Sequence, residues 1–153
     1  MSPGLKSGLI AALTVSARSC ADIPVVIFLL DSIETVKAVK HLKKNKFNYE
    51  IIKVPGVYEI PQFINWKLNS NKTNLFVALG CVIKGDTYHF EVISDAVGQS
   101  LLDISLSNPK TIITNGIINA YTGAQAKKRS KADSKNKGFE AASAMVRMIE
   151  CLT

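Results

Sequence analysis

The chain has 153 residues, of which 47% are hydrophobic, and a formal net charge of +7. This length predicts one globular domain over residues 1–153 with a loose segment over 1–8, and no stretch approaches the ~20 apolar residues of a membrane span. The positive charge favours anionic ligands or partners, but it does not distinguish a phosphate ester from nucleic acid.

Residues 9–16 are predicted to form the first buried strand. Lys6 and the apolar run behind it faintly resemble a secretory signal, but the run is of minimal length, and Arg18 and Asp22 follow closely. The cysteines are odd in number and lack CxxC spacing, so neither a disulfide framework nor a zinc site is indicated: Cys20, Cys81 and Cys151. A reducing compartment fits this pattern.

A helix is predicted to begin near Pro24, with Asp22 as its N-cap and Asn45 closing it. Its inward stripe consists of apolar residues at helical spacing, with lysines opposite: Ile33, Val36, Val39 and Leu42. Residues 47–54 form the second predicted strand, and Pro55-Gly56 then turns the chain.

A short helix is predicted from Glu59, with Pro61 in its first turn and Trp66 on its apolar side. Residues 75–82 are apolar and too few for an isolated helix, so they predict a buried strand. A flexible turn with two possible N-caps follows this strand: Gly85, Asp86 and Thr87.

The next segment, residues 89–106, has the apolar spacing of a helix, and Pro109 marks the start of a fourth strand over 111–118. Two helices complete the chain over 122–131 and 138–152. The apolar stripe of the last helix is Ala142, Met145, Val146 and Ile149. Alternating strands and helices predict an α/β fold whose parallel sheet is covered on both faces, with every strand-to-helix loop at one edge.

The helix that begins at His89 directly follows a strand end, and this arrangement suits an anion. Free backbone N–H groups and the helix dipole both favour negative charge there. The spacing from Gly80 through Gly85 to Thr87 superficially resembles a nucleotide-binding P-loop, but Asp86 occupies the position of the required lysine. Nucleotide hydrolysis is therefore disfavoured, and a general phosphate site remains.

His89 has two interpretations. A histidine in the first turn of a helix can simply bond a nearby carbonyl, but its place beside a glycine turn at this edge favours proton transfer. Tyr58 and Glu59 are predicted at the same edge, where they can stack on a ring and accept hydrogen bonds from hydroxyls. The simpler role of Glu59 is to stabilise a helix dipole.

The densest basic run, residues 127–137, holds six of the nineteen cationic side chains. Its simplest interpretation is a solvated segment between helices, and a nucleic-acid patch is the alternative. No aromatic residues interleave with these cations, so base stacking is not supported. One arginine or lysine directed at a phosphate fits the run equally well.

Three segments, taken together, resemble the signature regions of the lumazine synthase family: residues 54–61 (VPGVYEIP), residues 80–91 (GCVIKGDTYHFE), and Arg129 followed by Asn136-Lys137-Gly138. The resemblance runs from about residue 54 to the C-terminus and is weaker over the first third. It implies a flavodoxin-like three-layer sandwich around a four-stranded parallel sheet. It also implies pentamers, or multiples of them, with active sites between adjacent subunits.

The resemblance further implies a transferase of riboflavin biosynthesis. Such an enzyme condenses 5-amino-6-(D-ribitylamino)uracil with 3,4-dihydroxy-2-butanone 4-phosphate to 6,7-dimethyl-8-ribityllumazine, releasing phosphate and water. The uracil's amine attacks the ketone to form an imine, phosphate leaves, and ring closure follows with loss of water. No cofactor or metal is implied, and we expect a cytoplasmic homo-oligomer without a nucleic-acid or membrane partner.

By resemblance, His89 is the proton-transfer residue, and Lys137 adds positive potential. The phosphate is held by Asp86 and Thr87, and by Arg129 from a neighbouring subunit. The uracil and its ribityl chain contact two further segments: Val57, Tyr58 and Glu59, and Cys81, Val82 and Ile83.

Two positions depart from the family pattern, since Ser19 and Asn115 stand where aromatic residues stack on the pyrimidine. Either Tyr58 carries more of the ring contact, or affinity for the uracil is low. These departures leave one alternative function, a non-catalytic relative that binds a lumazine or flavin.

Overall fold

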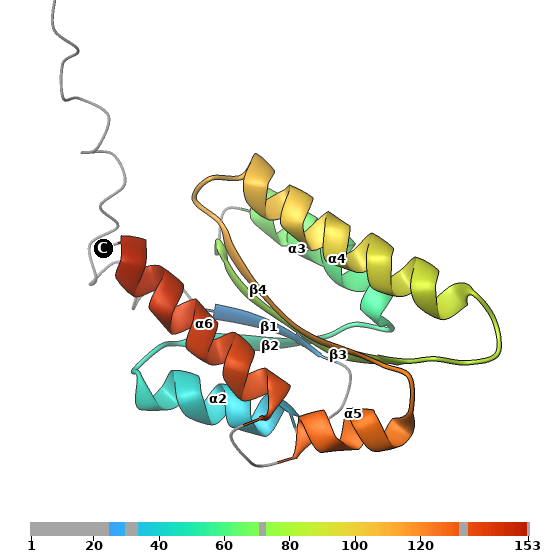
Figure 1. Cartoon of the computed structure of the whole chain (residues 1–153). Helices are drawn as coiled ribbons and strands as arrows, with labels where there is room; N and C mark the ends of the chain where they lie inside the picture. Colours follow the sequence, from blue (N-terminus) through green and yellow to red (C-terminus); the bar gives the residue numbers. More distant parts are fainter. Residues whose placement is uncertain (1–24, 30–33, 71–72, 132–134, 153) are drawn as a thin grey trace, which may run out of the picture.

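The computed structural model describes residues 25–29, 34–70, 73–131 and 135–152. Within these residues helices alternate with strands, and the strands form one parallel four-stranded sheet in the order β2-β1-β3-β4 (Figure 1). The strands are β1 (Val25–Leu29), β2 (Tyr49–Lys53), β3 (Leu75–Ile83) and β4 (Ile112–Ala120). The predicted α/β class with a parallel sheet is therefore confirmed.

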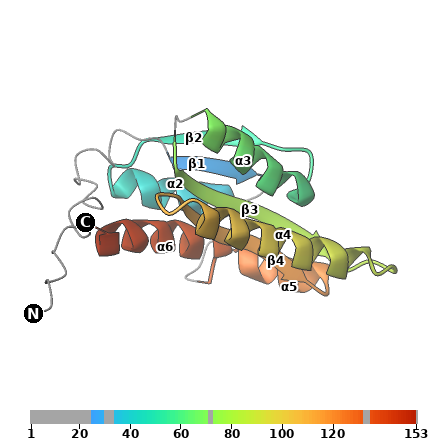
Figure 2. The ribbon, with the colours of Figure 1, turned by 90° about the horizontal axis from the view of Figure 1, so that it is seen from above.

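Helices cover both faces of this sheet (Figures 1 and 2). One face carries α3 (Ile60–Asn69) and α4 (His89–Ser107), and the other carries α2 (Glu34–Lys44), α5 (Gly123–Ser130) and α6 (Lys137–Leu152). A single 3-10 turn, η1 (Val57–Glu59), precedes α3. The helices α4 and α5 therefore lie on opposite faces of the sheet.

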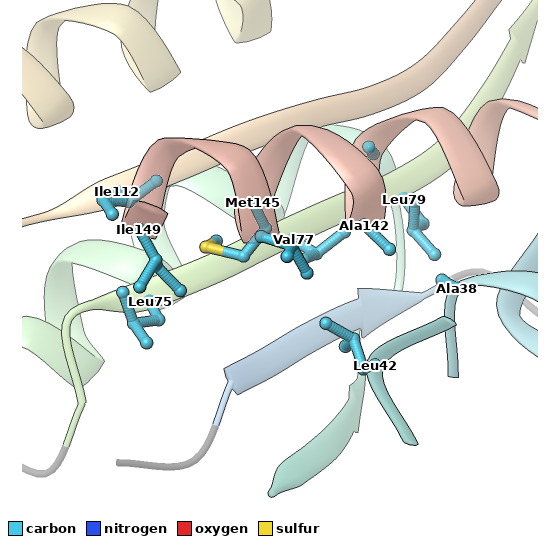
Figure 3. Close-up of a cluster of buried hydrophobic side chains, with 11 residues drawn as sticks. Ala38, Leu42, Leu75, Val77, Leu79, Ile112, Ala142, Met145 and Ile149 are labelled. Atoms are coloured by element: carbon cyan, nitrogen blue, oxygen red, sulfur yellow. The ribbon is translucent and has the colours of Figure 1, made fainter. Parts of the chain in front are cut away.

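The core lies on both sides of β3, whose continuous apolar run is buried between the two helix layers. Successive side chains of a strand point to opposite faces. Val77 accordingly packs with Leu42 of α2 and Met145 of α6 (Figure 3), while Phe76 packs in the cluster under α3 and α4. All four side chains are fully buried, as a strand covered on both faces requires.

The prediction of a helix from Pro24 is wrong over the described residues that follow it. Val25–Leu29 is the strand β1, which pairs with β2 on one side and β3 on the other. Its sequence VVIFL is short, apolar and rich in β-branched side chains, and such a run fits a buried strand as well as a helix. The helix α2 begins only at Glu34.

The end of α2 is as predicted, with Asn45 closing it. The Asn45 backbone N–H and its side-chain amide both donate to the carbonyl oxygen of His41, at 3.2 and 2.9 Å. The predicted inward stripe is confirmed at Leu42, which is fully buried, and at Val39, which packs against the core. It is wrong at Val36, which is 51% exposed, whereas the unpredicted Ala38 is fully buried. Several predictions lie outside the described residues: the strand over 9–16, the loose segment over 1–8, Asp22 as a cap, and Ile33.

The remaining elements lie where the sequence predicts them, with two differences in detail. Trp66 does not lie on an apolar inward side of α3: it is 63% exposed and contacts the ring of Phe63 edge-on. The N-cap of α4 is Tyr88, without a side-chain cap, and Thr87 Oγ1 only approaches the His89 N–H at 3.5 Å. The following helix is capped, since Thr122 and Gln125 form a capping box.

Substitution of Gly116 by alanine is expected to lower the free energy of unfolding by about 1–3 kcal/mol, because it overpacks the core. A Cβ there would collide with Leu79 Cδ2 and lie 2.9 Å from Ala141 Cβ of α6. Urea unfolding measures the loss. The control is Gly98→Ala in α4, where a Cβ meets nothing within 4 Å and gains helix propensity. A Gly116→Ala protein as stable as the wild type would contradict this packing.

Acid is expected to weaken the contact between α2 and α6 through His41. The imidazole lies edge-on against Phe139 at 4.8 Å between ring centroids. Burial and then the nearby Lys44 lower the pKa of His41 below its ordinary value of ~6.5. The folded state therefore favours the neutral ring. This contribution is fully present above pH ~6.5 and is lost as pH falls through the lowered folded pKa.

Denaturant unfolding of the wild type and of His41→Gln between pH 7.5 and about 5 tests this contribution. The wild type is expected to lose more stability on acidification than the variant, which keeps a polar side chain but cannot titrate there. His89 is present in both proteins and cancels in the comparison. Parallel pH dependences would show that His41 makes no such contribution.

Candidate active site

The loops that follow β2, β3 and β4 meet at the carboxyl edge of the sheet. Ile83 at the end of β3 pairs with Ala120 at the end of β4. The Lys84 N–H then donates to the Ala120 carbonyl oxygen at 2.9 Å, which extends the pairing by one residue. The chain leaves the sheet at this point and enters the turn before α4.

The segment after β2 is held against β3 by a glycine. A Cβ on Gly80 would lie 2.7 Å from Val57 Cγ2, so only the missing side chain lets η1 approach the strand this closely. Val57 is buried there, while Tyr58 is 58% exposed. The Glu59 carboxylate folds back over its own turn, with Oε2 2.6 Å from the position of a Cβ on Gly56. Two predicted groups are thereby brought together: Val57, Tyr58 and Glu59, and Cys81, Val82 and Ile83.

His89 is the first residue of α4, and it lies directly behind the turn over residues 85–88. The side chains of Asp86, Thr87, Tyr88 and His89 are all exposed at this edge. The N-terminus of a long helix leaves N–H groups free and carries the positive end of its dipole. The turn and the histidine therefore lie next to each other, exposed at the N-terminus of α4.

The structure adds a cluster that the sequence does not reveal. The Lys84 ammonium forms an ion pair with Glu91 in the first turn of α4. The same nitrogen lies over two rings, 5.9 Å from the centroid of Phe90 and 5.7 Å from that of Tyr121. In the sequence, the only signal for this cluster is a basic residue next to the glycine turn. The contact with Tyr121 depends on the register between β3 and β4.

Arg129 lies in α5, on the opposite side of the sheet from α4 (Figure 1). Its Nη2 donates to both carboxylate oxygens of Glu140 in α6, at 2.9 and 3.1 Å. Lys137 Nζ also reaches Glu140, at 3.3 Å from Oε2. Within one chain, the structure does not bring Arg129 to the turn before His89.

A buried asparagine links the ends of the two helices that carry this ion pair. The Asn136 side-chain amide donates to the carbonyl oxygens of Ser130 and Lys131 at the end of α5, at 2.9 and 2.8 Å. Its Oδ1 accepts the Phe139 N–H at 3.0 Å and so caps α6. Asn136 therefore orients the two helices that carry Arg129 and Glu140.

Asn115 is likewise separated from the turn within one chain. It lies on the edge strand β4 and pairs with Ala78, five positions before Ile83, or about 16 Å along the strand. Its exposed side chain accepts the Ile117 N–H at 2.9 Å. Ser19, the other departure from the family's aromatic positions, lies outside the described residues.

The other features of the described residues lie away from this edge. A cleft of about 690 Å³ opens at the opposite, amino edge, between the ends of α3 and α4, and none of its lining residues is a predicted site residue. No three or more His, Cys, Asp or Glu side chains in the described ranges are arranged to hold a metal ion. None of the helices in the described part of the chain is long and apolar enough to cross a membrane.

Comparison with known proteins gives one consistent result. A sequence model of the family described as 6,7-dimethyl-8-ribityllumazine synthase matches residues 31–153. The 6,7-dimethyl-8-ribityllumazine synthase of Bartonella tribocorum is 42% identical over 113 residues, which cover 73% of this chain and 74% of the relative. The enzyme of that name from Afipia carboxidovorans is 44% identical over 106 residues, covering 66% and 64%. A synthase from Caulobacter vibrioides is 39% identical over 103 residues, covering 67% of each chain.

Proposed function

The chain belongs to the 6,7-dimethyl-8-ribityllumazine synthase family, and from this premise we propose which of its residues carry the reaction. It is a transferase of riboflavin biosynthesis that condenses 5-amino-6-(D-ribitylamino)uracil with 3,4-dihydroxy-2-butanone 4-phosphate, releasing phosphate and water. The observation that carries this function is a family match that includes all three signature segments. No observation favours a relative that binds a lumazine or flavin without turnover.

The phosphate of the butanone is proposed to bind at the N-terminus of α4. Backbone N–H groups of the turn, including that of Asp86, and the Thr87 hydroxyl donate hydrogen bonds to its oxygens, and the helix dipole adds to the attraction. A dianion beside the Asp86 carboxylate also needs a cation. Arg129 is the proposed cation, supplied by a neighbouring subunit and supported by Lys137, because within its own chain Arg129 lies across the sheet.

The uracil is proposed to lie against the end of β3, where the backbone of Cys81, Val82 and Ile83 can bond its ring edge. Val57 and Tyr58 contact the ring and the ribityl chain, and the Glu59 carboxylate accepts hydrogen bonds from ribityl hydroxyls. Tyr58 supports this assignment, because its ring is exposed at the edge and available for stacking. We propose that Tyr58 takes over ring contact from the family's aromatic positions, which Ser19 and Asn115 occupy here.

His89 is proposed to move protons between the two reactants. The uracil's primary amine attacks the ketone carbon, and a proton must pass from nitrogen to the leaving hydroxyl as the imine forms. Loss of phosphate and closure of the second ring require further proton transfers. A histidine at the start of α4, next to the bound phosphate, is placed to serve each of these steps.

The turnover assay tests the function directly. The purified protein, mixed with both substrates, is expected to raise the absorbance of the lumazine and to release one phosphate for each lumazine formed. Tight binding of the uracil without either product would contradict an enzyme. Omitting the butanone phosphate provides the control.

The assembly is proposed to be a homo-oligomer, a pentamer or a multiple of it, built from flavodoxin-like sandwiches and acting in the cytoplasm. Two observations support the proposal. The turn before α4 and His89 are exposed at the carboxyl edge and form only half of the proposed site, and Arg129 lies across the sheet from this half-site in the same chain. Sedimentation velocity is expected to give a single species no smaller than five chains. A strict monomer would leave the half-site without its cation and would contradict the proposal.

A further inference from the structure

Lys84 is the last residue held by the sheet before the proposed phosphate turn. Its N–H bonds the Ala120 carbonyl oxygen at 2.9 Å, and residues 85–88 beyond it are exposed. A Cβ added to Gly85 would meet nothing within 4 Å, so no neighbouring side chain packs against this glycine. The conformation of the turn therefore depends on what fixes its two ends, which are Lys84 and the first turn of α4.

The Lys84 side chain joins both ends of the turn to a third element. Its ammonium is paired with Glu91 of α4 and lies over the rings of Phe90 and Tyr121. These rings also contact each other, with centroids 5.8 Å apart. Tyr121 is itself anchored, since its N–H donates to Gln125 Oε1 at 2.8 Å within the cap of α5. One cation thus connects the ends of β3 and β4 with the helix that begins at His89.

Lys84 is the ion-pair partner of the Glu91 carboxylate. Glu91 Oε2 is shielded from solvent and has no hydrogen-bond partner among the residues that the structure describes. The hydrogen bond from Lys84 lowers the pKa of Glu91 below its ordinary value, and the same bond raises the pKa of Lys84. Partly exposed ion pairs contribute little to the free energy of unfolding, so we expect this pair to act mainly on the local conformation of the turn.

We propose that Lys84, with Glu91 as its counter-ion, is a positioning residue that holds the phosphate turn at a fixed distance from His89. The inference rests on the proposed phosphate site. Lys84 does not touch the substrate in this arrangement, because its ammonium is occupied by Glu91 and two rings. A preorganised turn spares the ordering cost when the phosphate binds. Loss of Lys84 should therefore weaken the binding of the butanone phosphate more than the binding of the uracil.

Steady-state kinetics with each substrate varied in turn tests the inference. Lys84→Met keeps the stem and removes the charge, and it is expected to raise KM for the butanone phosphate ~10-fold while kcat changes by less than ~3-fold. Glu91→Gln is expected to raise the same KM. Lys84→Arg is expected to keep this KM close to the wild-type value, since arginine can pair with a carboxylate and stack on rings. The matched control is Lys43→Met. The Lys43 ammonium also lies over a ring, 5.7 Å from the centroid of Tyr49, but at the amino edge of the sheet.

The outcomes separate this inference from its premise. A wild-type protein that forms no lumazine would refute the proposed function, whereas an active wild type with an unchanged KM in Lys84→Met would refute only the positioning role. If Lys84 instead binds the phosphate directly, Glu91→Gln frees the ammonium and lowers KM, which overturns the inference. Circular dichroism on every variant identifies loss of fold, and Lys84→Arg and Glu91→Gln decide the question if Lys84→Met does not fold.

Discussion

His89→Ala is expected to slow condensation by ~10²-fold, and by no more than that, while both substrates still bind. The loss is limited because the variant keeps the proposed phosphate contacts of the turn and the proposed uracil contacts at the end of β3, so both reactants stay aligned. The reduction should appear in kcat rather than in either KM, since the imidazole is assigned to proton transfer and not to binding. Steady-state assays at saturating concentrations of both substrates measure it.

The chain provides its own control for this experiment, because it contains two histidines. His41 lies in α2, on the face of the sheet opposite α4, and packs against Phe139 of α6. At pH 7.5, His41→Gln should leave kcat unchanged. An unchanged rate in His89→Ala would remove this histidine from the mechanism, and a raised KM with normal kcat would reassign it to substrate binding.

Arg129→Ala is expected to raise KM for the butanone phosphate by ~30- to 100-fold, with a much smaller effect on KM for the uracil. A charge-assisted hydrogen bond to a phosphate is worth roughly 2–3 kcal/mol, and a planar guanidinium can make two of them. To reach the phosphate, Arg129 must release or share Glu140, which holds it at 2.9 and 3.1 Å. The two KM values, measured separately, give the result.

The matched control for Arg129 is its neighbour Lys128, an exposed cation on the same helix. Lys128→Ala changes the net charge by the same amount, so any shared effect reports the general field of the basic run. Only Arg129→Ala should produce the selective change. Equal increases in both KM values would contradict the assignment of Arg129 to the phosphate.

Much of this fold can be predicted from the sequence because local signals agree with the tertiary structure. The apolar run of β3, the glycine turn and the helical spacing behind His89 each specify one element, and together they place the histidine at the sheet edge. Where local signals are ambiguous, prediction fails. The sequence of Val25–Leu29 fits a strand and a buried helix equally well. Its pairing with β2 and β3 in the folded protein makes it a strand.

The parts of the site that sequence reasoning missed depend on long-range geometry. Lys84 meets Tyr121 because Ile83 pairs with Ala120. Arg129 meets Glu140 where Asn136 links the end of α5 to the start of α6. Neither contact has a signature in residue spacing. The same reasoning applies to Trp66, whose helical position alone does not indicate that it is exposed.

Subunit mixing tests most directly the central claim that each site joins the carboxyl edge of one chain to Arg129 of the next. His89→Ala and Arg129→Ala proteins, each strongly impaired at limiting butanone phosphate, are unfolded together in equal amounts and refolded. Random head-to-tail assembly then gives about one quarter of the sites both intact residues, so activity should rise well above that of either variant refolded alone. If the mixture is no more active than the average of its parts, His89 and Arg129 do not act in one site shared between subunits.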